Sequence, residues 1–274
     1  MFKWTNFFRG FAMGITETVP GVSASTIAML MGIYERLLSS LSDLTKGNIK
    51  RALGFLIPLG IGMVLALLIT ANIIEFLLSE HPIPTMFLFV GLVMGILPFL
   101  WRSAHSETNK SFKPYHYGLI IVAFILIGLT SFIGEPVETV ITNFNATTYA
   151  YLFFSGVIAS MALVLPGISG ALVLMILGAY HTAIAALGSF NLPVIAAIGL
   201  GVVVGVLFTS RIIRYFLKTY TQATYSIMLG LVAGSLLVIA PSALPDTFMY
   251  GLVSFFTFLA GLVTALTFGR AERT

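Results

Sequence analysis

Long runs of apolar residues, almost free of charged side chains, are the feature that most constrains this chain. Six of these runs lie at about 53–78, 84–101, 117–134, 192–218, 224–241 and 248–268. Each is long enough for a helix that crosses a bilayer, which takes about 20 residues. Only 9% of the residues are charged, against about 25% in a soluble domain. The sequence therefore predicts an all-α polytopic membrane protein that forms one integral membrane domain over residues 1–274.

Two further apolar stretches, 7–34 and 153–180, differ from these six because each is interrupted near its middle. The interruptions are the pairs Pro20-Gly21 and Pro166-Gly167. Proline removes a backbone hydrogen bond and glycine frees the backbone, so a helix breaks at such a pair. Each stretch is predicted to form two half-helices that meet at this break.

The distribution of basic residues indicates how the two broken stretches sit in the membrane. If both are re-entrant hairpins, all 14 Lys and Arg residues fall on one side of the membrane. If both cross, the basic loops are divided between the two sides. The basic side is the cytoplasmic side in membrane proteins. The sequence therefore predicts six transmembrane helices plus two re-entrant helical hairpins, with both termini in the cytoplasm.

The two halves of the chain resemble one another. Residues 1–135 are predicted to form a first repeat and residues 147–268 a second, each with one hairpin and three spans. The matched pairs include Pro20/Pro166, Ser23/Ser169 and Tyr34/Tyr180, which are 146 positions apart. A loop that is seven residues longer in the first half follows, and the pairs Gly62/Gly201, Gly91/Gly230 and Gly95/Gly234 are then 139 positions apart. Because three crossings are an odd number, the second repeat is inverted, and the two hairpin tips can meet near the midplane. Secondary transporters use this architecture.

The hairpin tips are candidates for an anion site. A half-helix begins after each break, and its free N–H groups favour an anion such as phosphate. The predicted phosphate-binding residues at the tips are Ser23, Ala24, Ser25, Thr26, Ser169 and Gly170. The alternative is that the tip hydroxyls only satisfy the broken backbone, as every intramembrane backbone group must be satisfied.

Three charged residues lie where a membrane protein rarely places them. Glu17 precedes the first break, and a carboxylate at that depth indicates coupling to a proton or a cation; the alternative is a structural hydrogen bond to a loop N–H. Arg211 lies inside the cytoplasmic end of its span and is a candidate counter-charge for the anion. Arg9 is a second candidate, although an interfacial anchor explains it equally well.

Several kinds of chemistry have no support in the sequence. There is no cysteine, and the four histidines lie in or beside loops without metal-ligand spacing. We therefore expect no catalytic residues, no metal, no cofactor and no nucleic-acid partner, but contacts with membrane lipids. Gly91/Gly95, Gly201/Gly205 and Gly230/Gly234 are predicted to pack helices within the chain, although small-residue pairs also support homo-oligomers.

With these residues in view, the chain resembles the bacterial polyprenyl-phosphate transporter family, formerly a domain of unknown function. The resemblance covers nearly the whole chain. It rests on Arg9-Gly10, the segment Glu17–Ser23, the segment Gly32–Glu35, the segment Leu165–Gly170, and Gly178-Ala179-Tyr180. The family often has Asp where this chain has Glu17.

The resemblance implies translocation of undecaprenyl phosphate from the outer to the inner leaflet of the bacterial plasma membrane. That movement recycles the lipid carrier for cell-wall synthesis, and a proton or sodium gradient would fit Glu17 as its driving force. The residues alone leave open a transporter or channel for a small soluble anion. A membrane-embedded phosphatase is disfavoured because it needs a nucleophile with a clustered acid, Arg or His.

Overall fold

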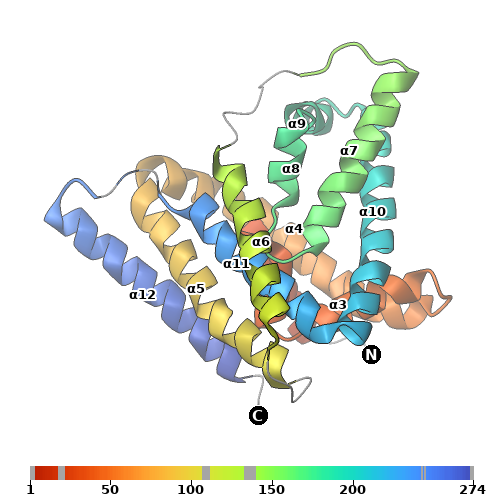
Figure 1. The fold of residues 1–274 in the computed structure, drawn as a ribbon. Helices are drawn as coiled ribbons and strands as arrows, with labels where there is room; N and C mark the ends of the chain where they lie inside the picture. Colours follow the sequence, from red (N-terminus) through yellow and green to blue (C-terminus); the bar gives the residue numbers. More distant parts are fainter. Residues whose placement is uncertain are drawn as a thin grey trace.

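A computed structural model describes residues 4–17, 22–106, 112–132, 140–241, 243 and 245–271. All regular structure in these ranges is helical (Figure 1). The helices are α1 (Trp4–Glu17), α2 (Ala24–Leu30), α3 (Tyr34–Leu44), α4 (Ile49–Glu80), α5 (Pro82–Ser106), α6 (Pro114–Gly128), the 3-10 helix η1 (Leu129–Phe132), α7 (Ala146–Val164), α8 (Gly170–Ile176), α9 (Tyr180–Gly188), α10 (Leu192–Thr219), α11 (Thr221–Ile239) and α12 (Phe248–Ala271).

Seven of the described helices are long and apolar enough to cross a membrane. Six of them, α4, α5, α6, α10, α11 and α12, coincide with the six predicted spans. The seventh, α7, is the first arm of the second broken stretch. It begins earlier than predicted because the Asn145 side chain accepts a hydrogen bond from the Thr148 N–H at 2.9 Å and caps the helix. The predicted class, an all-α polytopic membrane protein, is confirmed.

The second broken stretch turns back on itself. In Figure 1, α7 descends from the upper side and α8 returns toward that side, where α9 lies across the bundle. The angle between α8 and α9 is 107°. Pro166 and Gly167 lie in the link between α7 and α8, and Gly167 has a φ of 86°, which favours glycine. The predicted break at this pair is therefore confirmed, whereas Pro20 and Gly21 lie outside the described residues.

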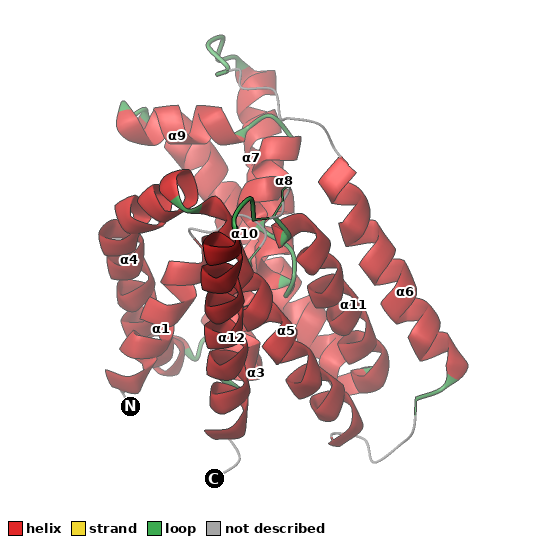
Figure 2. Cartoon of the chain, turned by 90° about the vertical axis from the view of Figure 1, so that its left-hand side faces the viewer, coloured by secondary structure: helices red, strands yellow, loops and turns green. Residues whose placement is uncertain are grey.

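The helices pack in pairs that correspond between the two halves. Helix α1 packs along α4, as α7 packs along α10, and α5 packs against α12 as α6 packs against α11. Helices α5 and α11 also pack against each other. The bundle begins with α1 and ends with α12 on the same, lower side (Figure 2).

Glycines allow these paired helices to approach to backbone contact. A Cβ atom added to Gly10 would lie 1.9 Å from the Leu59 carbonyl oxygen, and one added to Gly201 would lie 2.0 Å from that of Phe153. The pairs Gly91/Gly95, Gly201/Gly205 and Gly230/Gly234 meet α12, α7 and α6 in the same way. The prediction that they pack helices within the chain is confirmed.

One pairing has no counterpart. Helix α3 packs against α10, but the equivalent helices of the other half, α9 and α4, are not packed in this way in the described structure. The bundle is therefore closed between α3 and α10 and looser between α4 and α9.

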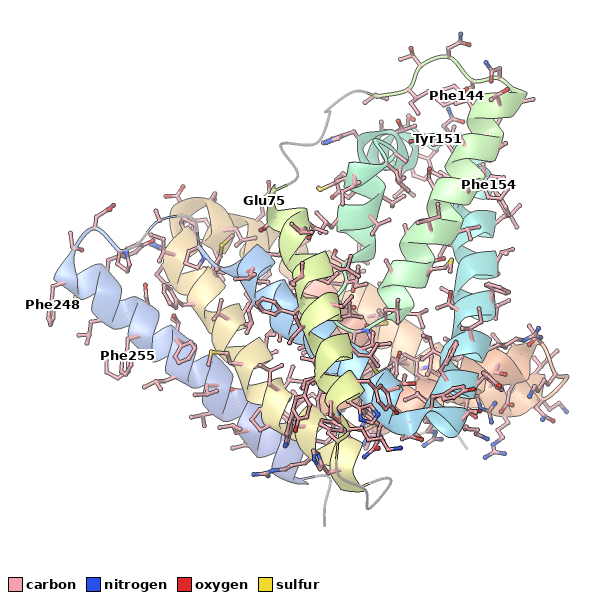
Figure 3. All side chains as sticks on the ribbon, viewed as in Figure 1. Glu75, Phe144, Tyr151, Phe154, Phe248 and Phe255 are labelled. Atoms are coloured by element: carbon pink, nitrogen blue, oxygen red, sulfur yellow. The ribbon has the colours of Figure 1, made fainter. Side chains whose placement is uncertain are left out.

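Large apolar side chains cover the outside of the bundle. Phe154, Phe248 and Phe255 point away from it (Figure 3), and their exposed fractions are 60%, 87% and 54%. A soluble protein would bury such side chains, whereas lipid tails solvate them without cost.

Candidate functional site

A cavity of about 750 Å³ occupies the loose region between α4 and α9. Helix α8 forms another wall, and α1 contributes its last residue, Glu17. The lining residues are Glu17, Leu67, Ala71, Ile74, Glu75, Leu78, Ser79, Ser169, Ala171, Leu172, Met175, Tyr180 and Ile184. Side chains from both broken stretches thus face one cavity.

Glu17 lines the cavity and also forms a hydrogen bond to the backbone of the next half-helix. Its Oε2 atom accepts a hydrogen bond from the Ala24 N–H at 3.1 Å. Ala24 is the first residue of α2, so the carboxylate accepts from one of the free N–H groups at the start of this helix. Glu17 therefore forms a structural hydrogen bond to a backbone N–H, which was one of the two alternatives that the sequence left open. Its coupling to a proton or a cation stays a prediction.

Ser169 lies at the corresponding place in the second broken stretch. It is the N-cap residue of α8, and its Oγ atom accepts a hydrogen bond from the Leu172 N–H at 3.4 Å. Gly170 follows it and is buried against α7, where an added Cβ atom would lie 2.9 Å from the Ala159 carbonyl oxygen. Ser169 is thus the tip hydroxyl that faces the cavity.

The hydroxyls of the first tip are engaged inside the protein. The Oγ atoms of Ser23 and Ser25 lie 2.6 Å apart, and Thr26 Oγ1 accepts a hydrogen bond from the Gly167 N–H at 2.9 Å. All three residues are at least 97% buried, and so is Ala24. In this structure Thr26 joins the two tips, Ser23 and Ser25 bond to each other within the first tip, and none of the three lines the large cavity.

A second bond also joins the two broken stretches. The Tyr34 hydroxyl, at the start of α3, donates to the Val164 carbonyl oxygen at the end of α7, at 2.9 Å. Its counterpart in the other half, Tyr180, lines the cavity. The tips are thus tied on the α3 side and open on the α9 side.

The two predicted arginines lie away from the cavity. Arg211 is exposed, and its Nε atom donates to Thr45 Oγ1 at 3.1 Å, between α10 and the end of α3. Arg9 is half-buried in α1 and is not among the lining residues. The described cavity lining contains two carboxylates, Glu17 and Glu75, and neither Lys nor Arg. Phosphate contacts by Arg9 and Arg211 stay a prediction.

Sequence reasoning missed Glu75 and Tyr180 as cavity residues. The signals were present, because Glu75 is the repeat counterpart of Arg214 and Tyr180 that of Tyr34. The spacing of the repeats does not indicate which member of each pair faces the open cavity.

Two apolar hollows lie next to each other between the first tip and the outer face of α4. A cavity of about 240 Å³ adjoins Ala24, Ser25 and Val164, and a wider groove of about 640 Å³ runs along the outer face of α4. Leu56 and Gly60 border both. A Cβ atom added to Gly60 would meet nothing within 4 Å, so there is open space beside this glycine where the two hollows share a border.

The fold defines a multi-pass helical membrane protein with an internal cavity lined by side chains from both broken stretches. A family model described as undecaprenyl phosphate translocase-like matches residues 13–253, and the chain belongs to this family. The polyprenyl-phosphate transporter of Staphylococcus aureus (strain NCTC 8325 / PS 47) is 37% identical over 277 residues, 98% of this chain and 97% of that protein. No solved structure matches the chain.

A second relative agrees with the first. The polyprenyl-phosphate transporter of Vibrio cholerae serotype O1 (strain ATCC 39315 / El Tor Inaba N16961) is 32% identical over 250 residues, 86% of this chain and 77% of that protein. The resemblance noted from the sequence is confirmed. Both relatives are named as transporters, which supports a transporter and not an enzyme.

Proposed function

We propose that this protein carries polyprenyl phosphate, with undecaprenyl phosphate as the substrate, from the outer to the inner leaflet of the bacterial plasma membrane. This movement returns the lipid carrier for cell-wall synthesis. The family membership and the names of both relatives support the substrate. The observation that carries the proposal is the shared cavity of Glu17 and Ser169, one from each broken stretch.

The two halves act as inverted repeats in this proposal. The packing of α1 along α4, which matches that of α7 along α10, supports the inverted repeat. The contact of α5 with α11 also supports it, because these two helices are equivalent in the two halves. The lower side in Figure 1, where the chain begins and ends, is the cytoplasmic side. The cavity then opens outward. Transport exchanges the two packings: α3 separates from α10 as α9 closes on α4.

The cavity needs a cation to hold a phosphate. A phosphate monoester carries a charge between −1 and −2 near pH 7, and Glu17 and Glu75 add two carboxylates without a basic side chain in the described lining. A proton or Na⁺ on Glu17 lowers this repulsion and leaves Glu75 as the one charged carboxylate of the described lining. The phosphate then binds beside Ser169 and Gly170, and the cation moves with it. Ser23, Ala24, Ser25 and Thr26 join the site when the tips separate.

The prenyl tail leaves the protein sideways. A polyprenyl chain is too long to enclose, so the site must open to lipid. The apolar groove at Leu56 and Gly60 lies beside the first tip, apart from the lining of the Glu17 and Ser169 cavity, and it supplies that opening once the tips separate. This lateral opening favours a lipid phosphate over a small soluble anion, which an enclosed site would serve better.

The test is transport in liposomes that carry polyprenyl phosphate in the outer leaflet. Exposure in the inner leaflet is followed with and without a proton or Na⁺ gradient, for the wild type, Glu17→Gln and the control Glu80→Gln. Glutamine keeps an oxygen that accepts the Ala24 N–H but lacks the negative charge that attracts a proton or Na⁺, whereas Glu80 lies outside the cavity lining. We expect only Glu17→Gln to lose gradient-driven movement. No movement by the wild type under either gradient contradicts the lipid function.

A further inference from the structure

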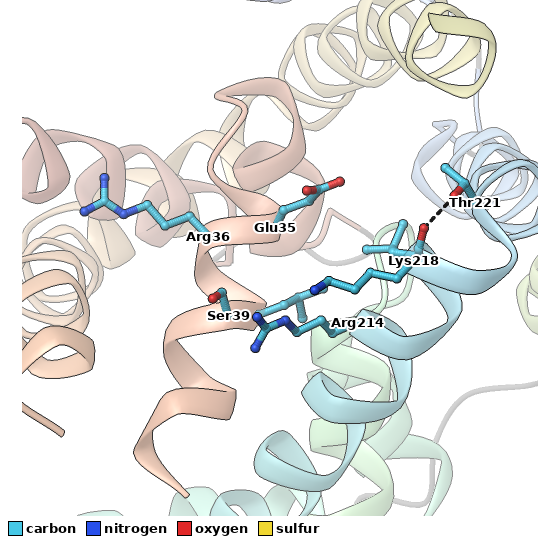
Figure 4. A pocket seen from close by; sticks show the side chains of 8 residues that line it. Glu35, Arg36, Ser39, Arg214, Lys218 and Thr221 are labelled. Carbon is cyan, nitrogen blue, oxygen red and sulfur yellow. Dashed lines mark hydrogen bonds between the residues drawn. The ribbon is translucent and has the colours of Figure 1, made fainter. Parts of the chain in front are cut away.

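A second polar cleft lies on the opposite side of the protein, between α3 and α10. Its volume is about 450 Å³. It is lined by Glu35, Arg36, Leu38, Ser39, Arg214, Leu217, Lys218 and Thr221. In Figure 4, Arg214 and Lys218 extend from α10 toward Ser39 on α3, while Arg36 points away to the other side of α3.

Arg214 is half-buried, and one nitrogen of its guanidinium is shielded from water. Its Nη1 atom is buried, and no hydrogen-bond acceptor for it is found in the described structure. A buried donor without an acceptor is costly, and more so when it is charged. Arg36 has a different contact, because its guanidinium lies 4.7 Å from the centre of the Phe55 ring. Arg214 is therefore the side chain of this cleft that most needs an anion.

The cleft occupies the same place in the second repeat as the outer cavity occupies in the first. Arg214 corresponds to Glu75, and Lys218 corresponds to Ser79. Leu38 and Leu217 likewise correspond to Ile184 and Leu78. Equivalent positions thus carry a carboxylate on one side and a guanidinium on the other. An anion that moves from the outer cavity to the cleft leaves the repulsive carboxylate of Glu75 and meets the attractive guanidinium of Arg214.

We propose that the α3–α10 cleft is a second phosphate site, which receives the phosphate monoester head group on the side where the chain begins and ends. Arg214 and Lys218 bind its oxygens, and the Ser39 hydroxyl donates a further hydrogen bond. Glu35 also lines the cleft and lowers the net positive charge of the cleft. The phosphate is therefore held less tightly and can be released. The inference rests on the proposed function, because it assigns the receiving end of the same path.

Binding to the purified protein in detergent tests this site. Farnesyl phosphate serves as a short prenyl phosphate, farnesol as the same chain without phosphate, and inorganic phosphate as the head group alone. The double variant Arg214→Gln, Lys218→Gln is compared with Lys50→Gln, Arg51→Gln, which removes two exposed charges from the start of α4, outside the cleft. We expect the first variant to bind farnesyl phosphate about tenfold more weakly and the control to match the wild type.

A second readout locates the bound head group. The chain has no cysteine, so Ser39→Cys places one thiol in the cleft and leaves both basic side chains intact. We expect farnesyl phosphate to slow the reaction of this thiol with a water-soluble methanethiosulfonate, and farnesol to have no effect. Ser79→Cys reports on the outer cavity in the same way.

The outcomes separate the cleft from the transport function. Equal binding by the two double variants, or protection at Ser79→Cys without protection at Ser39→Cys, overturns the second site even when the liposomes show transport. Protection of Ser39→Cys by inorganic phosphate but not by farnesyl phosphate overturns the lipid head group as its ligand. A wild type that binds farnesyl phosphate in the cleft but moves no lipid in liposomes contradicts the proposed function and leaves the site.

Discussion

Thr26 and Gly167 lie 141 positions apart and share one hydrogen bond, in which the Gly167 N–H donates to Thr26 Oγ1 at 2.9 Å. Both residues are buried at the tips of the two broken stretches. The bond joins the first half of the chain to the second at the point where each helix is interrupted. In this conformation the two tips are therefore in direct contact.

Removal of the Thr26 hydroxyl should weaken the protein. Thr26→Val keeps the size of the side chain but leaves the buried Gly167 N–H without its acceptor, which costs about 1–2 kcal/mol. We expect a lower Tm in detergent, followed by the fluorescence of Trp4 and Trp101. Thr264→Val is the control, because Thr264 is exposed and bonds only within its own helix. Equal Tm values for the two variants would show that the bond between the tips adds no stability.

A methyl group between α1 and α4 should be more damaging than one facing lipid. Gly10→Ala would place Cβ 1.9 Å from the Leu59 carbonyl oxygen, so the helices must separate at a cost of about 2 kcal/mol or more. Gly118→Ala meets nothing within 4 Å and should leave the Tm unchanged or raised, since alanine favours the helix. Thermal unfolding of the two variants side by side decides the point. A Tm for Gly10→Ala at or above that of Gly118→Ala would refute the close packing.

The passage at Gly60 should control access of the prenyl tail. Gly60→Leu fills the open space between the apolar cavity and the outer groove without a backbone clash. We expect the variant to fold with a normal Tm but to move long polyprenyl phosphates at least about tenfold more slowly in liposomes. Gly118→Leu, also in open space, is the matched control and should transport normally. Undiminished transport by Gly60→Leu would place the tail elsewhere.

The contact of α3 with α10 should open during transport. Thr45 and Arg211 form a hydrogen bond across it, and the chain has no cysteine of its own. In the double variant Thr45→Cys, Arg211→Cys, a short reducible thiol cross-linker should stop transport, and a reductant should restore it. Transport by the double variant before cross-linking is the reference, because Arg211 is itself a predicted phosphate contact, and the single variant Thr45→Cys treated alike should remain active. Full transport by the cross-linked protein would mean that this contact is static.

Local residue patterns were sufficient to predict the helices and their membrane setting. The apolar runs predicted six spans within a few residues, because a helix in lipid must be long, apolar and internally hydrogen-bonded. The break at Pro166-Gly167 followed from the chemistry of those two residues alone. The matched glycines indicated close packing within the chain, and the structure contains it. The family was also evident, because the motifs that carry the resemblance are contiguous.

Only the tertiary structure decided which side chains meet. Ser23 and Ser169 are equivalent in the sequence, yet Ser169 faces the cavity while Ser23 is buried against Ser25. Arg211 bonds to Thr45, whereas Arg214, one turn further along the same helix, lines a cleft. The reason is that two similar repeats are packed differently, with α3 against α10 and a gap between α9 and α4. Because the two halves are similar in sequence, the repeat is compatible with either arrangement, α3 packed on α10 or α9 packed on α4. The contacts of the whole bundle select the first.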